Sequence, residues 1–148
     1  MTSPNNETYA AFHSVLGSHF VNFKLKALTD AYIALSSAHE HIDVGGYTVA
    51  LGIGAEISAI FVGTGSDKRE VKATNTAGVL DPNTFQWFWL SWADGLIEVG
   101  TGEVKDESTV LVSWNDSNPT PVQSISVASG FAEADSGAQW EFSFDNGL

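Results

Sequence analysis

The sequence predicts an all-β fold, an antiparallel β-sandwich (jelly-roll-like) of about 8–10 strands. Three observations carry this prediction. Short runs of apolar, β-branched and aromatic residues recur along the chain, many with the period of two that a half-buried strand shows. Turn-forming residues separate these runs about every 8–12 positions. No window of about 12 residues combines a 3.6-residue apolar period with helix caps.

The first clear strand is 19–28, where Val21, Phe23 and Leu25 point to one side and polar residues to the other. Before it, residues 9–16 fit either a short strand or one helical turn. Further strands are predicted at 31–35, 47–54, 57–62, 70–73 (an edge strand with charges), 109–114, 122–128 and 139–144. Between them, residues 36–46 are predicted to be a polar loop.

A hairpin over 84–102 organises the rest of the chain. Asp94-Gly95 separates two strand-like runs, and glycine tolerates the positive φ that a tight turn needs. By alternation, one face of the first strand carries Phe85, Trp87 and Trp89, and the opposite face carries Phe88, Leu90 and Trp92. We expect both faces to be buried at the centre of the sandwich.

The length of 148 residues predicts a single domain over 1–148, with a flexible start at 1–8. The absence of cysteine excludes disulfides, thiolate zinc sites and a cysteine nucleophile. Eighteen acidic residues against six basic ones give a net charge of −12, which argues against nucleic acid as a partner. No signal peptide or membrane-length apolar run is visible, so we expect a soluble protein without membrane insertion, cytosolic or extracellular.

The run from Phe85 to Gly102 reads Phe-x-Trp-Phe-Trp-Leu-Ser-Trp-x-Asp-Gly-Leu-Ile-x-Val-Gly-Thr-Gly. It resembles the signature of the farnesoic acid O-methyltransferase domain family. Further agreement lies at 30–35, at 47–52, at 110–114 with Asp116 and Pro119, and in the closing Gly137-x-x-Trp140-x-Phe142. The resemblance covers a family-like β-sandwich over 20–144. It implies kinship with extracellular recognition modules that accompany adhesive or immune-type domains, and therefore a binding role, with carbohydrate as the expected ligand.

The family name also implies methyl transfer from S-adenosylmethionine. Such donor sites commonly lie in a parallel α/β crevice behind a glycine-rich strand-to-helix turn. Here the glycine pairs at 52–54 and 63–65 precede more strand or a polar turn. The sequence therefore predicts no enzyme, with a small-molecule O-methyltransferase as the alternative.

Sugars present apolar C–H faces and hydroxyl edges, so their sites pair aromatic rings with carboxylates and amides. Trp114-Asn115-Asp116 offers this combination at a strand end, and Trp140 is a second aromatic candidate. The alternative is that both tryptophans belong to the core and that Asn115 and Asp116 belong to a turn.

The segment 39–43 supplies His39, Glu40, His41 and Asp43 as further ligand-binding candidates. If extended, it places His39, His41 and Asp43 on one face, as a set for a divalent metal or as hydrogen-bond partners for a sugar. A polar surface loop without a ligand is the alternative.

No cofactor is expected, although acidic pairs could supply oxygen ligands to calcium. The pairs considered are Asp106 with Glu107 and Glu133 with Asp135, and neither has a recognisable calcium-loop spacing.

We predict a lectin-like, carbohydrate-binding protein of the innate-recognition type that forms a homo-oligomer, because multivalency compensates for weak single sites. A protein-binding adhesion domain is the remaining alternative.

Overall fold

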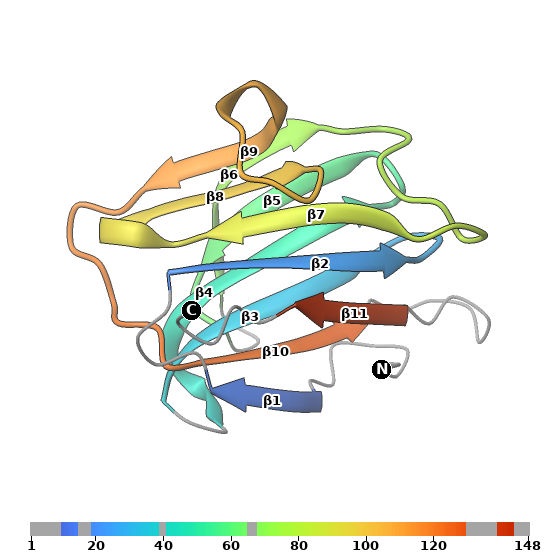
Figure 1. The fold of residues 1–148 in the computed structure, drawn as a ribbon. Coiled ribbons are helices and arrows are strands. Elements are labelled where there is room, and N and C mark those ends of the chain that lie inside the picture. Colours follow the sequence, from blue (N-terminus) through green and yellow to red (C-terminus); the bar gives the residue numbers. More distant parts are fainter. Residues whose placement is uncertain (1–9, 15–18, 39–40, 65–67, 130–138, 144–148) are drawn as a thin grey trace.

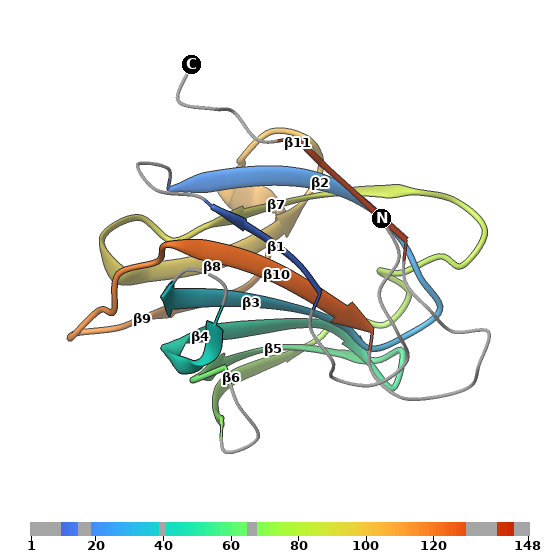
Figure 2. The same ribbon diagram turned by 90° about the horizontal axis from the view of Figure 1, so that it is seen from below.

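The chain folds as a sandwich of two antiparallel β-sheets (Figure 1), which Figure 2 shows from below as two stacked layers. This computed structural model describes residues 10–14, 19–38, 41–64, 68–129 and 139–143. Every strand pair in these residues is antiparallel. The predicted all-β sandwich is confirmed.

One sheet has six strands and the other has five. The six-stranded sheet runs β1 (Ala10–Ser14), β10 (Ser124–Ser129), β3 (Ala31–Ala38), β4 (His41–Ile53), β5 (Ile57–Val62) and β6 (Arg69–Asn75). The five-stranded sheet runs β11 (Gln139–Ser143), β2 (Phe20–Lys26), β7 (Gln86–Ser91), β8 (Leu96–Thr101) and β9 (Val110–Asn115). Within residues 9–16, which fit either a strand or a helical turn by sequence, the structure has strand β1. Strand β6 lies at a sheet edge, as predicted.

Helical structure in the described chain consists of two three-residue 3-10 turns, η1 (Ala93–Gly95) and η2 (Glu107–Thr109). No helix in the described part of the chain is therefore long and apolar enough to cross a lipid bilayer. In η1, Asp94 and Gly95 both have positive φ, at 54° and 81°, so the predicted Asp-Gly turn is confirmed.

The predicted polar loop over 36–46 was wrong for its described residues. Strand β3 continues to Ala38 and β4 begins at His41, with Ala38 paired to His41 and Ser36 paired to Gly46. The two strands are already in register at Leu35 and Tyr47. Extending this ladder satisfies backbone groups without apolar side chains, which is why a polar composition did not end the strands.

The core lies between the inner faces of the two sheets. Alternate residues of β2 (Val21, Phe23 and Leu25) point inward and are buried, as the sequence predicts. They pack with Ile33 and Leu35 of β3 in one continuous cluster. Burying these side chains supplies the main driving force for joining the two sheets.

The two faces of β7 meet different surroundings. Phe88, Leu90 and Trp92 join the core cluster, as expected. Trp89 points to the outer face of the five-stranded sheet and is nevertheless 0% exposed. Trp87, on the same outer face, is half-buried. The expectation that both faces are buried therefore holds for Trp89 and fails for Trp87, because only part of the outer face is covered.

The cover over Trp89 is the segment 102–109 between β8 and β9. The indole Nε1 of Trp89 donates a 3.1 Å hydrogen bond to Thr109 Oγ1, and Lys105 Nζ lies 5.6 Å from the centre of its ring. Beneath the indole, a Cβ at Gly100 would come within 2.5 Å of three ring atoms. Glycine at position 100 therefore lets Trp89 lie flat against β8.

Candidate functional site

The loop after β9 places the first group of predicted ligand-binding residues. Trp114 is half-buried, packs against the core and pairs with Ile97 on β8. Asn115 is exposed at the end of β9. Asp116 accepts hydrogen bonds on both carboxylate oxygens, from Tyr47 Oη at 2.7 Å and from the Asn118 amide at 2.9 Å. Asp116 therefore builds the loop, and its availability as a sugar ligand stays a prediction.

Trp140 lies in the core and is 1% exposed. Its ring centre is 5.7 Å from that of Phe23 and 5.8 Å from that of Phe142. The expectation that Trp140 offers an exposed stacking surface was wrong. The reason is register, because Trp140 pairs with Leu25, whose side chain points into the sandwich.

His39 and Glu40 lie outside the described residues. His41 and Asp43 belong to β4, so their backbone is in a strand rather than a loop. Within the described ranges, no group of three or more metal-ligating side chains comes together as a metal site. The ligand role of the 39–43 segment stays a prediction.

A pocket of about 340 Å³ opens at the end of the sandwich where β7 turns into β8. It is lined by His19, Trp92, Asp94, Gly95, Pro119, Thr120, Pro121 and Val122. Figure 1 shows that the start of β2, the η1 turn and the connection from β9 to β10 meet at this end of the molecule, on the left of the view. Three segments distant in sequence thus form one concave surface.

Backbone contacts join these segments. The Trp92 amide donates to the His19 carbonyl at 3.0 Å, and the Asp116 amide donates to the Gly95 carbonyl at 2.9 Å. A Cβ at Gly95 would lie 2.8 Å from the Asp116 carbonyl oxygen and 3.0 Å from Pro119 Cβ. Only glycine permits both this close approach and the positive φ of the turn.

Tyr47 fixes the pocket wall from inside the sandwich. Its hydroxyl donates to Asp116 Oδ2 at 2.7 Å and accepts a 2.9 Å hydrogen bond from the Thr120 amide. Burial raises the pKa of Tyr47 above its usual value, and the hydrogen bond to Asp116 adds to this by favouring the protonated phenol. At neutral pH the phenol therefore stays a donor that holds the loop in place.

We expect Tyr47→Phe to lower the free energy of unfolding by about 1–3 kcal/mol, because it leaves the Thr120 amide and an Asp116 oxygen without their partner. Urea denaturation followed by circular dichroism measures the change. A double-mutant cycle with Asp116→Ala isolates the pair and should give a coupling energy above about 0.5 kcal/mol. Strict additivity of the two substitutions would show that the hydrogen bond does not hold the loop.

The pocket combines an apolar floor with a few polar groups. Trp92 is 6% exposed and belongs to the core, so it forms the floor. His19 and Asp94 are both exposed, and Thr120 is half-buried between two prolines. An imidazole, a carboxylate and a hydroxyl around an apolar floor match the mixed C–H and hydroxyl surface of a sugar.

None of these lining residues was among the ligand-binding residues predicted from the sequence. Trp92, Asp94 and Gly95 were recognised only as the end and the turn of the aromatic hairpin. The sequence signal that could have identified Trp92, Asp94 and Gly95 as pocket residues is the carboxylate of Asp94 close behind the aromatic run that ends at Trp92. His19 and Thr120 carry no local signal, because only the fold brings them beside η1.

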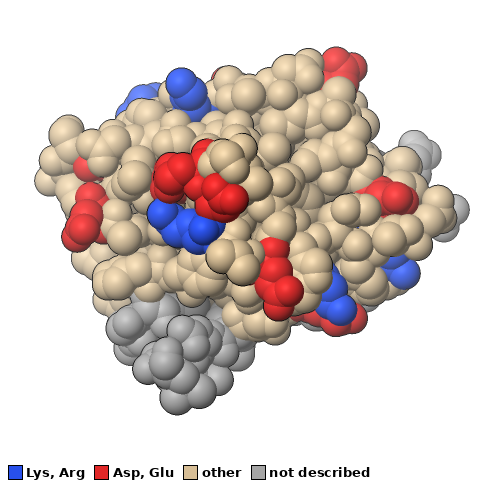
Figure 3. Space-filling model, turned by 45° about the horizontal axis from the view of Figure 1, so that its top comes forward, with Lys and Arg blue, Asp and Glu red and all other residues tan. Residues whose placement is uncertain are grey.

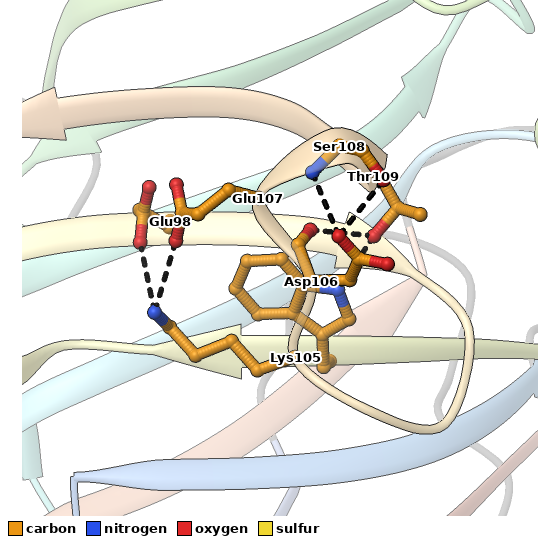
Figure 4. A network of polar contacts seen from close by, with 7 residues as sticks. Glu98, Lys105, Asp106, Glu107, Ser108 and Thr109 are labelled. Atoms are coloured by element: carbon orange, nitrogen blue, oxygen red, sulfur yellow. Dashed lines mark hydrogen bonds and ion pairs between the residues drawn. The ribbon is translucent and has the colours of Figure 1, made fainter.

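A second polar cluster lies on the outer face of the five-stranded sheet (Figure 4). Lys105 Nζ stands between two carboxylates, 3.5 Å from Glu98 Oε1 and 3.0 Å from Glu107 Oε2. Glu98 is 4% exposed, and burial, followed by the nearby Glu107 carboxylate, raises its pKa. The hydrogen bond to Glu107 raises the pKa of Lys105 in turn. These contacts tie segment 102–109 to β8.

Asp106, which the sequence offers with Glu107 as an oxygen ligand for calcium, has a structural role inside this cluster. Its Oδ1 accepts hydrogen bonds from the Ser108 amide at 2.9 Å and the Ser108 hydroxyl at 2.8 Å, which lower its pKa. Asp106 thereby caps the η2 turn. Glu133 and Asp135 lie outside the described residues.

Figure 3 shows one face of the molecule, where basic side chains lie in small separate groups and several of them sit directly beside acidic ones. Most of this face is uncharged. It carries no continuous basic surface of the kind that follows a phosphate backbone.

Comparison with solved structures shows lectin-like neighbours at low sequence identity. Sheep galectin-11 in complex with glycerol matches with a TM-score of 0.62 and 10% identity, over 97% of this chain and 99% of that chain. The carbohydrate-binding module CBM66 from Bacillus subtilis matches with a TM-score of 0.61 and 10% identity, over 89% and 74%. The exoplasmic/lumenal domain of VIP36, bound to Ca²⁺ and Man3GlcNAc, matches with a TM-score of 0.59 and 10% identity, over 92% of this chain and 72% of that chain. These matches show a shared fold.

No curated protein matches the sequence. The family model described as farnesoic acid O-methyltransferase matches residues 5–146, which is nearly the entire chain. The hairpin from Phe85 to Gly102, which carries the resemblance, also supplies Trp92, Asp94 and Gly95 to the pocket. The chain therefore belongs to the farnesoic acid O-methyltransferase family.

Proposed function

We propose that this protein is a non-enzymatic recognition module that binds a neutral saccharide in the pocket between η1 and residues 119–122. The observation that carries the proposal is the pocket itself, where His19, Asp94 and Thr120 surround the Trp92 floor. The lectin-like neighbours support it, because their fold is one on which carbohydrate sites are built. Fold alone does not give function, so the side chains of the pocket have to carry the argument.

Charge favours a neutral ligand. Among the described residues that line the pocket, Asp94 is the one carboxylate, and none is a lysine or an arginine. With a net charge of −12 on the whole chain, an acidic sugar would be repelled from this end. A neutral sugar can instead donate hydroxyl hydrogen bonds to Asp94 while its C–H face lies against Trp92 and the prolines.

A glycan array, run with and without a chelator, tests the proposal. We expect binding to neutral saccharides that persists in the chelator, because the pocket supplies its polar contacts from side chains. Absence of glycan binding at high protein concentration would refute a lectin-like role. Calorimetry with S-adenosylmethionine tests the methyltransferase alternative, and measurable affinity would favour that activity over recognition.

Two substitutions locate the binding site. We expect His19→Ala and Asp94→Asn each to weaken binding of the array ligand by about tenfold, because each removes a hydrogen-bonding group from the pocket. Both side chains are exposed, so thermal midpoints should be unchanged, and asparagine tolerates the positive φ at position 94. Glu103→Gln, at an exposed residue outside the pocket, is the matched control for charge. Equal losses in Asp94→Asn and Glu103→Gln would place the ligand elsewhere.

A further inference from the structure

The outer face of the five-stranded sheet carries a second surface suited to a ligand, at the end opposite the pocket. Phe85 and Trp87 lie there, where β7 begins, and both are half-buried. In Figure 1 this is the right-hand end, where β2 ends and β7 starts. Trp89 continues the aromatic row but is closed beneath segment 102–109. Two rings of the row therefore remain accessible.

Two lysines stand over these rings. Lys24 and Lys26 alternate with the inward residues of β2, so they share the outer face, where Lys24 pairs with Trp87 across the strands. Lys24 Nζ lies 5.6 Å from the ring centres of both Phe85 and Trp87. Lys26 Nζ lies 4.9 Å from the centre of Phe85. Two of the six basic residues of the chain thus converge on one ring.

Among the described residues, the positive charges at this surface outnumber the negative ones. Lys24 pairs with the exposed Glu141 on the neighbouring strand at 3.2 Å. Lys26 makes no ion pair with any described residue, although the chain contains 18 acidic residues. Two ammonium groups held over the same ring repel each other. A second anion placed beside Lys26 would relieve this repulsion.

We propose that Lys24, Lys26, Phe85 and Trp87 form a second binding site, for a carboxylated saccharide of the uronic acid type. The sugar ring would place its C–H face on the exposed part of Trp87, and its carboxylate would lie between the two ammonium groups. The carboxylate of Glu141 already occupies an equivalent position beside Lys24. This inference goes beyond the proposed pocket, because the site is separate and selects the opposite charge class.

Apart from these two lysines the molecule is mostly acidic, and this limits the kind of anionic ligand that the site can bind. A densely charged polyanion would be repelled by the net charge of −12 wherever it extended beyond the two lysines. A saccharide with one carboxylate per sugar ring needs only a local pair of cations, and its remaining surface can stack on aromatic rings. The combination of lysines and flat rings therefore favours an acidic sugar.

Calorimetry with trigalacturonic acid and with the neutral galactotriose tests the inference. We expect the acidic trisaccharide to bind about tenfold more tightly than the neutral one, from charge-assisted hydrogen bonds to Lys26. Raising sodium chloride from about 20 mM to about 500 mM should remove most of this preference by screening. Lys26→Gln should also remove it. Lys72→Gln, at an exposed lysine on β6 of the other sheet, is the control. It deletes the same charge and should leave the preference for the acidic trisaccharide unchanged.

Glu141→Gln provides a test of opposite sign. It removes the carboxylate that competes for Lys24, so it should tighten trigalacturonic acid binding severalfold, whereas Glu103→Gln should have little effect. Any one of three results would overturn the inference. The two trisaccharides could bind with equal affinity, or Lys26→Gln and Lys72→Gln could weaken trigalacturonic acid binding equally. The third result is an equal change in that affinity from Glu141→Gln and from Glu103→Gln. Neutral-sugar binding that depends on Asp94 would survive such a result, so the two proposals can fail separately.

Discussion

Trp89→Ala should lower the free energy of unfolding by about 3–5 kcal/mol, the usual range when a fully buried tryptophan is truncated. The indole lies flat against Gly100 and beneath the side chain of Lys105. Its removal would leave a cavity between β8 and segment 102–109. It would also leave Thr109 Oγ1 without the hydrogen bond from Trp89 Nε1.

Urea denaturation followed by far-ultraviolet circular dichroism measures this loss without relying on tryptophan fluorescence. Trp87→Ala is the matched control, because Trp87 lies two residues away on the same strand face but is only half-buried. We expect Trp87→Ala to have less than half the effect of Trp89→Ala. Similar effects for the two variants would contradict the finding that segment 102–109 selectively covers Trp89.

Trp140→Ala should have a comparable effect of about 3–5 kcal/mol. Trp140 contributes a buried ring to an aromatic group with Phe23 and Phe142. It lies on β11, which pairs with β2 and with no other strand of the described residues, so its packing is a major part of what holds that strand. Truncation is expected to weaken the attachment of β11 as well as to open a cavity.

The same urea measurement, with Gln139→Ala as the control, tests this second prediction. Gln139 is the exposed neighbour of Trp140 on β11 and should be nearly neutral. Trp140→Phe should retain part of the stability because it keeps a ring in the core. A Trp140→Ala protein of unchanged stability that no longer bound glycans would restore the view of Trp140 as a ligand residue.

The strands were predictable because their pattern is local. In β2, alternation alone places Val21, Phe23 and Leu25 in the core and Asn22, Lys24 and Lys26 outside. The Asp94-Gly95 turn was equally clear, since both residues adopt the positive φ for which their types are suited. The extension of β3 and β4 through residues 36–38 and 41–46 was missed because backbone pairing, rather than apolar side chains, sustains those strands.

The candidate site was harder to predict because its parts are distant in sequence. His19, Asp94 and Thr120 are brought together by backbone bonds at Trp92 and Gly95 and by the hydroxyl of Tyr47. Nothing in the local sequence around Tyr47 indicates that it reaches Asp116, 69 positions away. The cover over Trp89 is likewise a tertiary contact, so alternation could assign its face but not its burial.

The central claim is that the pocket beside η1 is the saccharide site, and nuclear magnetic resonance tests it most directly. The chain has five tryptophans, so a ¹⁵N-labelled sample gives five indole N–H signals to follow during titration with the strongest neutral saccharide from the array. We predict that the Trp92 indole and the His19 signals shift together and saturate at the affinity measured by calorimetry. We also predict that the Trp87 and Trp114 indoles stay in place. Shifts confined to Trp87 or Trp114, with Trp92 and His19 unchanged, would contradict the assignment of the pocket.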